Sequence, residues 1–199
     1  MLFHTASLDL DLLVLFNQTL RGSLLDVLAP VLSSRAALFI LMALCLAWAV
    51  RRLGPRQIVL FVLLLAAAGL SDLACGQIKD QVLRVRPMNA LPGVYYQESG
   101  EWQRRPPDFV QTKGDGSSYP SAHAANSMTL AVLAMLLWPR TRPWLGILPL
   151  LVGWSRIYLG KHYPSDVLSG WLLGLCVAAL VWTLWKGVLE RRVLPPKES

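Results

Sequence analysis

The chain has 199 residues, enough for one domain and too few for two of ordinary size. Hydrophobic residues make up 54% of it and charged residues only 16%, and the mean hydropathy of +0.45 excludes an ordinary soluble domain. The net charge of +7 would suggest nucleic acid in a soluble protein, but here the basic residues collect in loops between apolar stretches, so we expect no nucleic-acid partner. We expect a single membrane-embedded domain over residues 1–199.

The N-terminal segment, residues 1–35, is apolar but interrupted by charged and amide side chains. These are Asp9, Asp11, Asn17, Gln18, Arg21 and Asp26. Charges at mid-bilayer are costly, so two short helices broken near Arg21 and Gly22, interfacial or partly re-entrant, fit better than a straight span. If the segment does cross, the N-terminus is cytoplasmic. The start of the chain has no basic stretch with a small-residue cleavage site, so we expect no cleaved signal peptide.

Five later stretches have the apolar character of membrane spans, which need roughly 20 mostly apolar residues. They cover about 36–50, 57–77, 123–138, 144–159 and 165–189. With the N-terminal segment this predicts an all-α polytopic transmembrane bundle of six helices. Cys45, Cys75 and Cys176 fall within apolar stretches, where we expect packing residues and no disulfide or metal site.

The basic residues predict an orientation. One group lies in two short loops and after the last span, and comprises Arg51, Arg52, Arg56, Arg140, Arg142, Lys186, Arg191, Arg192 and Lys197. Such loops are typical of the cytoplasmic face. The other group lies on the opposite side and comprises Lys79, Arg84, Arg86, Arg104, Arg105, Lys113, Arg156 and Lys161. This pattern predicts a bacterial inner-membrane protein with a cytoplasmic C-terminus and a cationic site on the periplasmic side that binds an anion.

A polar loop rich in Gly and Pro, residues 88–117, lies on the non-cytoplasmic side between two motif-bearing helices. Loops of this length are usually functional lids or disordered segments. We favour a lid or a substrate-access loop.

Three short stretches hold nearly all the polar residues that apolar packing cannot explain. They are the run from Lys79 to Arg86-Pro87, the run Pro120-Ser121-Ala122-His123, and Ser155-Arg156 followed by His162 and Asp166. The order of spans places all three at the same membrane face. Lys79, Arg86 and Arg156 would supply the cations that a phosphate group needs. Ser121, just before an apolar helix, adds a hydroxyl and nearby free backbone N–H groups.

His162 and Asp166 are four residues apart, and a helix starting near Pro164 would let the carboxylate turn back to the imidazole. Such a partner fixes the tautomer and stabilises the imidazolium. His123 comes from another helix and is free to donate a proton. One histidine to attack and one to protonate the leaving oxygen would suffice for phosphoryl transfer.

Simpler interpretations exist for each residue alone. Arg84 and Lys161 fit better as snorkelling interface anchors, and Asp166 alone would fit as a first-turn carboxylate favoured by the helix dipole. The joint spacing of the three stretches argues against these interpretations for the rest, and two of the chain's three histidines fall within them. His4 receives no role.

Together, Lys79-x6-Arg86-Pro87, Pro120-Ser121-Ala122-His123 and Ser155-Arg156-x5-His162-x3-Asp166 resemble the three signature motifs of the type 2 phosphatidic acid phosphatase superfamily, whose soluble relatives include vanadium haloperoxidases. The resemblance covers residues 79–166 and implies a haloperoxidase-like helical core. It implies that His162 is the nucleophile that forms a phosphohistidine, oriented by Asp166, and that His123 is the general acid. It also implies that the other motif residues bind the phosphoryl oxygens, namely Lys79, Arg86, Ser121, Arg156 and the N–H of Ala122.

The family usually has glycine where this chain has Ala122. A positive φ there would strain alanine, whereas a role for its N–H alone would not. We favour the second case.

The function expected from these features is hydrolysis of a lipid phosphate or diphosphate, with undecaprenyl diphosphate as first choice. Alternatives are the 1-phosphate of lipid A, phosphatidylglycerol phosphate and phosphatidic acid. A phosphotransferase, a non-catalytic lipid-binding or transport protein, and a haloperoxidase are further alternatives. We expect no cofactor and no metal, because three nearby cations would repel a divalent ion from the weak ligand set of two histidines and one aspartate.

Overall fold

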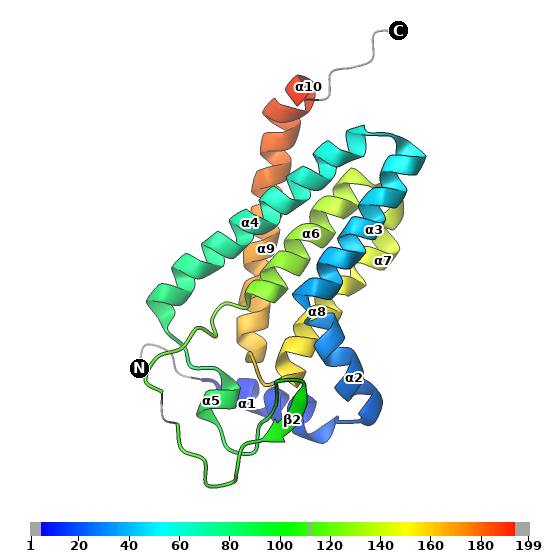
Figure 1. Cartoon of the computed structure of the whole chain (residues 1–199). Coiled ribbons are helices and arrows are strands. Elements are labelled where there is room, and N and C mark those ends of the chain that lie inside the picture. Colours follow the sequence, from blue (N-terminus) through cyan, green and yellow to red (C-terminus); the bar gives the residue numbers. More distant parts are fainter. Residues whose placement is uncertain (1–4, 112, 194–199) are drawn as a thin grey trace.

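The computed structural model describes residues 5–111 and 113–193, which form a helical bundle with a small polar cap at one end (Figure 1). His4 and Lys197 therefore lie outside the described residues. In chain order the elements are α1 (Ser7–Val14), a π-helical turn (Leu15–Thr19), α2 (Ser23–Leu32), α3 (Arg35–Leu53), α4 (Arg56–Val82), α5 (Pro87–Ala90), β1 (Tyr95–Glu98), β2 (Glu101–Arg104), α6 (Ala122–Leu137), a 3₁₀ turn (Pro139–Thr141), α7 (Arg142–Leu145), α8 (Ile147–Tyr158), α9 (Pro164–Leu184), a second π-helical turn (Trp185–Leu189) and α10 (Glu190–Val193).

The five stretches predicted as spans form the helices α3, α4, α6, α8 and α9, with ends shifted by a few residues. Within the described residues, α3, α4 and α9 with its π-helical extension are long and apolar enough to cross a membrane. Helix α6 is a shorter apolar helix of 16 residues, and α8 has 12. Many large apolar side chains on the outside of the bundle are exposed, as expected for a surface in contact with lipid.

The N-terminal segment forms two short helices in place of one straight span, as its charged and amide side chains predicted. Helices α1 and α2 meet at a bend of 119°, and both lie at the end of the bundle that also carries α5 and the strands (Figure 1). The sequence explains the break, because Arg21 and Gly22 interrupt the apolar run and the glycine backbone is extended before α2. The broken or re-entrant arrangement is the one that the structure shows.

The polar side chains that argued against a straight crossing dock this segment onto the bundle. Asn17 is fully buried and pairs with the backbone of β1, accepting from the Tyr95 N–H at 2.9 Å and donating to the Tyr95 carbonyl at 2.8 Å. Its amide also donates to the carbonyl of Tyr158, at 2.7 Å. The guanidinium of Arg21 lies 4.2 Å from the ring centre of Trp102 and 4.3 Å from that of Tyr95. Cation–π contacts of this kind stabilise a partly buried arginine.

The polar loop contains structure that the sequence analysis did not anticipate. Helix α5 and an antiparallel hairpin of β1 and β2 occupy part of residues 88–117, with Tyr96 opposite Gln103. The indole N–H of Trp102 donates to the Asp26 carbonyl at 3.2 Å, which joins the hairpin to α2. This part of the loop is a packed cap, and its role as a lid stays a prediction.

Close packing of α6 against α9 brings the second and third motifs together. A Cβ atom at Gly170 would lie 2.5 Å from the Ser121 carbonyl oxygen, and one at Gly174 would lie 2.4 Å from the Ala125 carbonyl oxygen. Such distances leave no room for a side chain, so glycine is required where the two backbones approach. Thr129 adds a hydrogen bond to the Gly174 carbonyl at 3.1 Å.

We predict that Gly170→Ala destabilises the protein by about 1–3 kcal/mol, the usual range for overpacking, because the methyl group would displace α6. The measurement is the thermal unfolding midpoint of the purified protein in detergent. Gly76→Ala is the matched control, since a Cβ at Gly76 in α4 meets nothing within 4 Å. Equal midpoints for both variants would contradict the close-packing interpretation.

Candidate active site

All three sequence motifs meet at the end of the bundle that carries the cap. Lys79 lies in the last turn of α4, and Arg156 lies in the last turn of α8. His123 is the second residue of α6, His162 lies in the turn between α8 and α9, and Asp166 lies in the first turn of α9. The helix directions therefore bring together residues up to 87 positions apart in the sequence (79 to 166).

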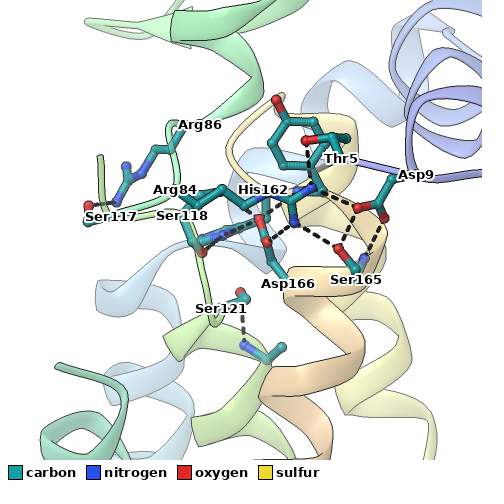
Figure 2. Close-up of polar contacts among 12 residues, drawn as sticks. Thr5, Asp9, Arg84, Arg86, Ser117, Ser118, Ser121, His162, Ser165 and Asp166 are labelled. Atoms are coloured by element: carbon teal, nitrogen blue, oxygen red, sulfur yellow. Dashed lines mark hydrogen bonds and ion pairs between the residues drawn. The ribbon is translucent and has the colours of Figure 1, made fainter. Parts of the chain in front are cut away.

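The orientation of His162 defines its chemistry. Its ring is 2% exposed, and Nδ1 lies 2.7 Å from the carbonyl oxygen of Ser118 (Figure 2). A carbonyl oxygen can only accept a hydrogen bond, so Nδ1 carries the proton. In a neutral ring the lone pair is then on Nε2. Ser118 was not singled out from the sequence, because a backbone carbonyl in an irregular loop leaves no signal in residue type.

Asp166 supports His162 less directly than the four-residue spacing suggested. Its Oδ2 lies 3.6 Å from Nδ1 of His162, whereas it accepts from the Ser118 hydroxyl at 2.5 Å and from the Tyr163 N–H at 2.8 Å. The predicted contact with the imidazole is thus an electrostatic one, and the hydrogen bond that fixes the tautomer comes from Ser118. Asp166 holds both Ser118 and the turn that carries the imidazole.

Arg84 is not a snorkelling interface anchor, which corrects the sequence interpretation. Its side chain is 4% exposed and lies against two carboxylates, at 2.5 Å from Asp166 Oδ1 and 2.8 Å from Asp9 Oδ2 (Figure 2). Its guanidinium also lies 3.9 Å from the ring centre of Tyr163. The sequence held a signal for this network, since Asp9 is a charge inside an apolar segment and such charges need a partner.

Positive charge gathers beside the imidazole, and no ion pair between a carboxylate and Lys79, Arg86 or Arg156 occurs within residues 5–111 and 113–193. The charge of Asp72 acts on Lys79, and that of Asp166 acts on Arg86. The charges of Lys79, Arg86 and Arg156 lie close enough to act on one another, and those of Arg86 and Arg156 act on His162. Arg156 is 4% exposed, and its Nε atom is buried with no hydrogen-bond partner among the described residues. Arg86 donates to the Ser117 hydroxyl at 3.2 Å. Burial lowers the pKa of Arg86, as expected for a cation removed from water.

Lys161 also belongs beside this cluster and is not an isolated surface anchor. Burial lowers the pKa of its ammonium group, and the charges of Arg156 and Arg86 lower it further. Neighbouring cations disfavour the charged form of one another, and a bound anion would favour it.

Ser121 and Ala122 form the start of α6. The Ser121 hydroxyl caps the helix by accepting from the Ala124 N–H at 3.5 Å, and its own N–H donates to the Asp166 carbonyl at 2.9 Å. Among the described residues other than glycine, positive φ values occur at Leu83 and Ser99, so Ala122 carries no such strain. This agrees with the favoured case, in which alanine replaces glycine without backbone cost.

His123 faces a different environment from His162. It lines a groove of about 440 Å³ between α3, α4, α6 and α8, with apolar walls that include Leu38, Met42 and Leu130. Arg35, Asp72 and Asn126 line the same groove. The charges of Arg156 and of a protonated His162 act on His123, so the two histidines share one site. A group bound between the two imidazoles could extend an apolar chain into the groove.

No group of three or more His, Cys, Asp or Glu side chains suited to a metal ion occurs within residues 5–111 and 113–193. The expectation of a metal-free reaction stays a prediction.

Comparison with known proteins agrees with this geometry. The sequence model of the PAP2 superfamily matches residues 58–188, which is more than half of the chain. The chain belongs to the PAP2 superfamily. It is 33% identical over 131 residues to an undecaprenyl-diphosphatase of Sulfolobus acidocaldarius, a match that covers 65% of this chain and 54% of that protein. The chain thus spans about half the length of the curated relatives it matches.

Two solved structures share the fold. The crystal structure of Aquifex aeolicus LpxE has a TM-score of 0.69 at 24% identity, covering 92% of this chain and 99% of that chain. The transmembrane PAP2-type phosphatidylglycerolphosphate phosphatase of Bacillus subtilis has a TM-score of 0.65 at 26% identity, covering 93% and 89%. With its apolar helices, this PAP2 protein is a membrane protein.

Burial lowers the pKa of His162 to about 4, and the nearby Asp166 only partly offsets this effect. We therefore predict a neutral ring at pH 6.5, where a free imidazole is half protonated. Nitrogen NMR of histidine-labelled protein, assigned with His162→Gln, should show protonated Nδ1 and bare Nε2 at that pH. A ring that is half charged at pH 6.5, or that carries its proton on Nε2, would contradict this assignment.

Proposed function

We propose that this PAP2 protein is a membrane phosphatase that hydrolyses a lipid phosphate or diphosphate through a phosphohistidine at His162. The observation that carries the proposal is the contact of His162 Nδ1 with the Ser118 carbonyl at 2.7 Å, which leaves Nε2 for attack, beside the cations Lys79, Arg86 and Arg156. The free lone pair on Nε2 can attack an electrophilic atom, and the nearby cations favour a substrate in which that atom belongs to an anionic group. A phosphoryl group meets both requirements.

The first step joins Nε2 of His162 to phosphorus and breaks the bond from phosphorus to the leaving oxygen. Lys79, Arg86 and Arg156 neutralise the charge that the equatorial oxygens carry in the transition state. The N–H of Ala122 and the Ser121 hydroxyl, at the start of α6, would add hydrogen bonds. His123 gives its proton to the leaving oxygen. No negative charge then develops on that oxygen as the alcohol or lipid monophosphate departs.

The second step reverses these roles. His123, now neutral, takes a proton from water, and the water oxygen attacks phosphorus as the bond to Nε2 breaks. Inorganic phosphate leaves and His123 is again protonated. The proton stays on Nδ1 of His162, which donates to the Ser118 carbonyl throughout. Asp166 stabilises the positive charge that the ring carries while it is phosphorylated.

A lipid substrate is supported by the groove beside His123. Because His123 serves the leaving oxygen, the groove holds the leaving group, and its apolar walls suit a hydrocarbon chain. The names of relatives agree, since they include an undecaprenyl-diphosphatase and a phosphatidylglycerolphosphate phosphatase. Lipid A 1-phosphate, phosphatidylglycerol phosphate and phosphatidic acid remain the alternative substrates.

Arg35 favours a diphosphate as first choice. It is exposed at the start of α3, lines the groove together with His123, and is close enough for its charge to act on both His123 and Arg156. When the terminal phosphate is attacked, the second phosphate leaves with the lipid on the groove side. Arg35 supplies a cation there, which a lipid monophosphate does not need.

The proposed orientation places the site at the periplasmic face of a bacterial inner membrane. The basic loops between α3 and α4 and between α6 and α8 lie at the opposite end of the bundle, as expected for the cytoplasmic side (Figure 1).

A panel of lipid phosphates with free phosphate as readout tests the function. We expect release from undecaprenyl diphosphate, complete loss in His162→Ala, and a loss of about 10²–10⁴-fold in His123→Ala, the usual contribution of a general acid. Activity should survive EDTA. Loss of activity in EDTA, followed by its recovery when metal is added, would count against the mechanism. Transfer of label to a lipid acceptor in place of phosphate release would identify a phosphotransferase. Binding without turnover would identify a non-catalytic lipid-binding protein, and vanadate-dependent halide oxidation would identify a haloperoxidase.

The role of Arg35 gives a separate prediction. Arg35→Gln should lower kcat/KM for undecaprenyl diphosphate by about fivefold, which corresponds to about 1 kcal/mol, the upper value for an exposed charge contact, and leave undecaprenyl monophosphate hydrolysis unchanged. Arg142→Gln, at the opposite end of the bundle, is the control. Equal losses on both substrates would show that Arg35 does not recognise a second phosphate.

A further inference from the structure

The side-chain network behind His162 extends well beyond the three motifs. Starting from the imidazole, it runs through Ser118 to Asp166, then through Arg84 to Asp9 in the N-terminal helix α1 (Figure 2). Arg84 comes from the segment after α4. The network therefore joins the first helix of the chain to the candidate nucleophile.

Each contact in the network is buried and short. Arg84 presents one nitrogen to each carboxylate, Nη1 to Asp166 and Nη2 to Asp9, at 2.5 and 2.8 Å. The Asp9 side chain is 7% exposed and that of Asp166 is not exposed at all. Two carboxylates this close would repel each other strongly in a buried site without the guanidinium between them. Arg84 thus offsets the repulsion between the two carboxylates and holds Oδ1 of Asp166 by an ion pair.

Asp9 does more than neutralise Arg84. Its Oδ1 accepts from the backbone N–H of Ser165 at 2.8 Å, and its Oδ2 accepts from the Ser165 hydroxyl at 2.5 Å. Ser165 is the second residue of α9, so a carboxylate from α1 binds the N-terminal turn of α9. Negative charge is favourable there because it faces the positive end of the helix dipole. The turn that carries His162 and Asp166 is therefore held from α1.

We propose that Arg84 and Asp9 are positioning residues for phosphoryl transfer, holding Asp166 and the first turn of α9 so that Nε2 of His162 faces the phosphoryl site. The inference rests on the proposed function. It gives α1 a role in the reaction, although no residue of α1 reaches the cation cluster through a contact recorded in the described part of the chain. Small displacements of a nucleophile are costly, with a shift of about 1 Å worth roughly 100-fold in rate.

The test measures kcat and KM for free phosphate release by Arg84→Gln, Arg84→Lys and Asp9→Asn. We expect Arg84→Gln to lower kcat by about 100-fold with little change in KM, because Lys79, Arg86 and Arg156 still hold the phosphate. Arg84→Lys should recover part of the loss, since one ammonium keeps the charge but cannot serve both carboxylates with a planar fork. Asp9→Asn, which keeps shape and removes charge, should lower kcat less than Arg84→Gln.

A double variant tests whether Asp9 and Arg84 act together on His162 or affect the rate independently. Because Asp9 contacts both Arg84 and Ser165, the variant with both Asp9→Asn and Arg84→Gln should lose more than Arg84→Gln alone but less than the product of the two single losses. Arg21→Gln is the matched control, because Arg21 also pairs with an aspartate, Asp26, in the N-terminal segment and has no recorded contact with Asp166. Its kcat should stay at the parent value. Additive losses, or a higher KM with unchanged kcat, would overturn the proposal.

Vanadate binding, followed as the thermal shift of purified protein, keeps the test independent of the lipid. Vanadate needs the same Nε2 position, so Arg84→Gln should bind it at least about tenfold more weakly than the parent and Arg21→Gln should not. If the parent binds vanadate but hydrolyses no lipid phosphate, the proposed function fails and the vanadate affinities still decide the positioning role. Equal vanadate affinity in all variants, or no binding by the parent, would overturn that role.

Discussion

Positive charge from Lys79, Arg86 and Arg156 gathers in the site with no ion-paired carboxylate in the part of the chain that the structure describes, and this constraint shapes the rest of the site. Removing a cation from water costs several kcal/mol unless an opposite charge offsets it. Asp166, whose charge acts on Arg86, is already engaged by Arg84 and by the hydroxyl of Ser118. The unmatched charge is therefore left for a ligand, and a phosphoryl group supplies the oxygens that it can bind.

The fold pairs Asp166 with Arg84 and leaves the neighbouring cation cluster without an ion pair among the described residues. Behind Nδ1 of His162 lies a network of Ser118, Asp166, Arg84 and Asp9, in which every charge has a partner. The charges of Arg86 and Arg156 also act on His162, and His123 lines the groove. The glycines of α9 allow α6 to approach closely enough for both histidines to belong to one site. A neutral imidazole that is oriented by the network and lies near the cation cluster is suited to attack an anion.

Much of this arrangement could be predicted from the sequence, because apolar runs of sufficient length define the spans and their order fixes which helix ends share a face. Pro164 correctly marked the start of α9. Ser118 could not be found this way, since its backbone carbonyl acts from an irregular loop. The pairing of Arg84 with Asp9 could not be predicted, because Arg84 alone fits an interface anchor and its partner lies 75 residues away in the chain. The hairpin was missed because each of its strands has only four residues, and because Asn17, which joins it to the N-terminal segment, lies 78 residues from Tyr95.

The most direct test of the central claim is an experimental structure of the protein with vanadate bound. The account predicts vanadium bonded to Nε2 of His162, its equatorial oxygens on Lys79, Arg86 and Arg156, and an apical oxygen facing His123. Vanadate held away from His162, or an imidazole whose Nε2 points to the Ser118 carbonyl with Nδ1 toward the cations, would contradict it.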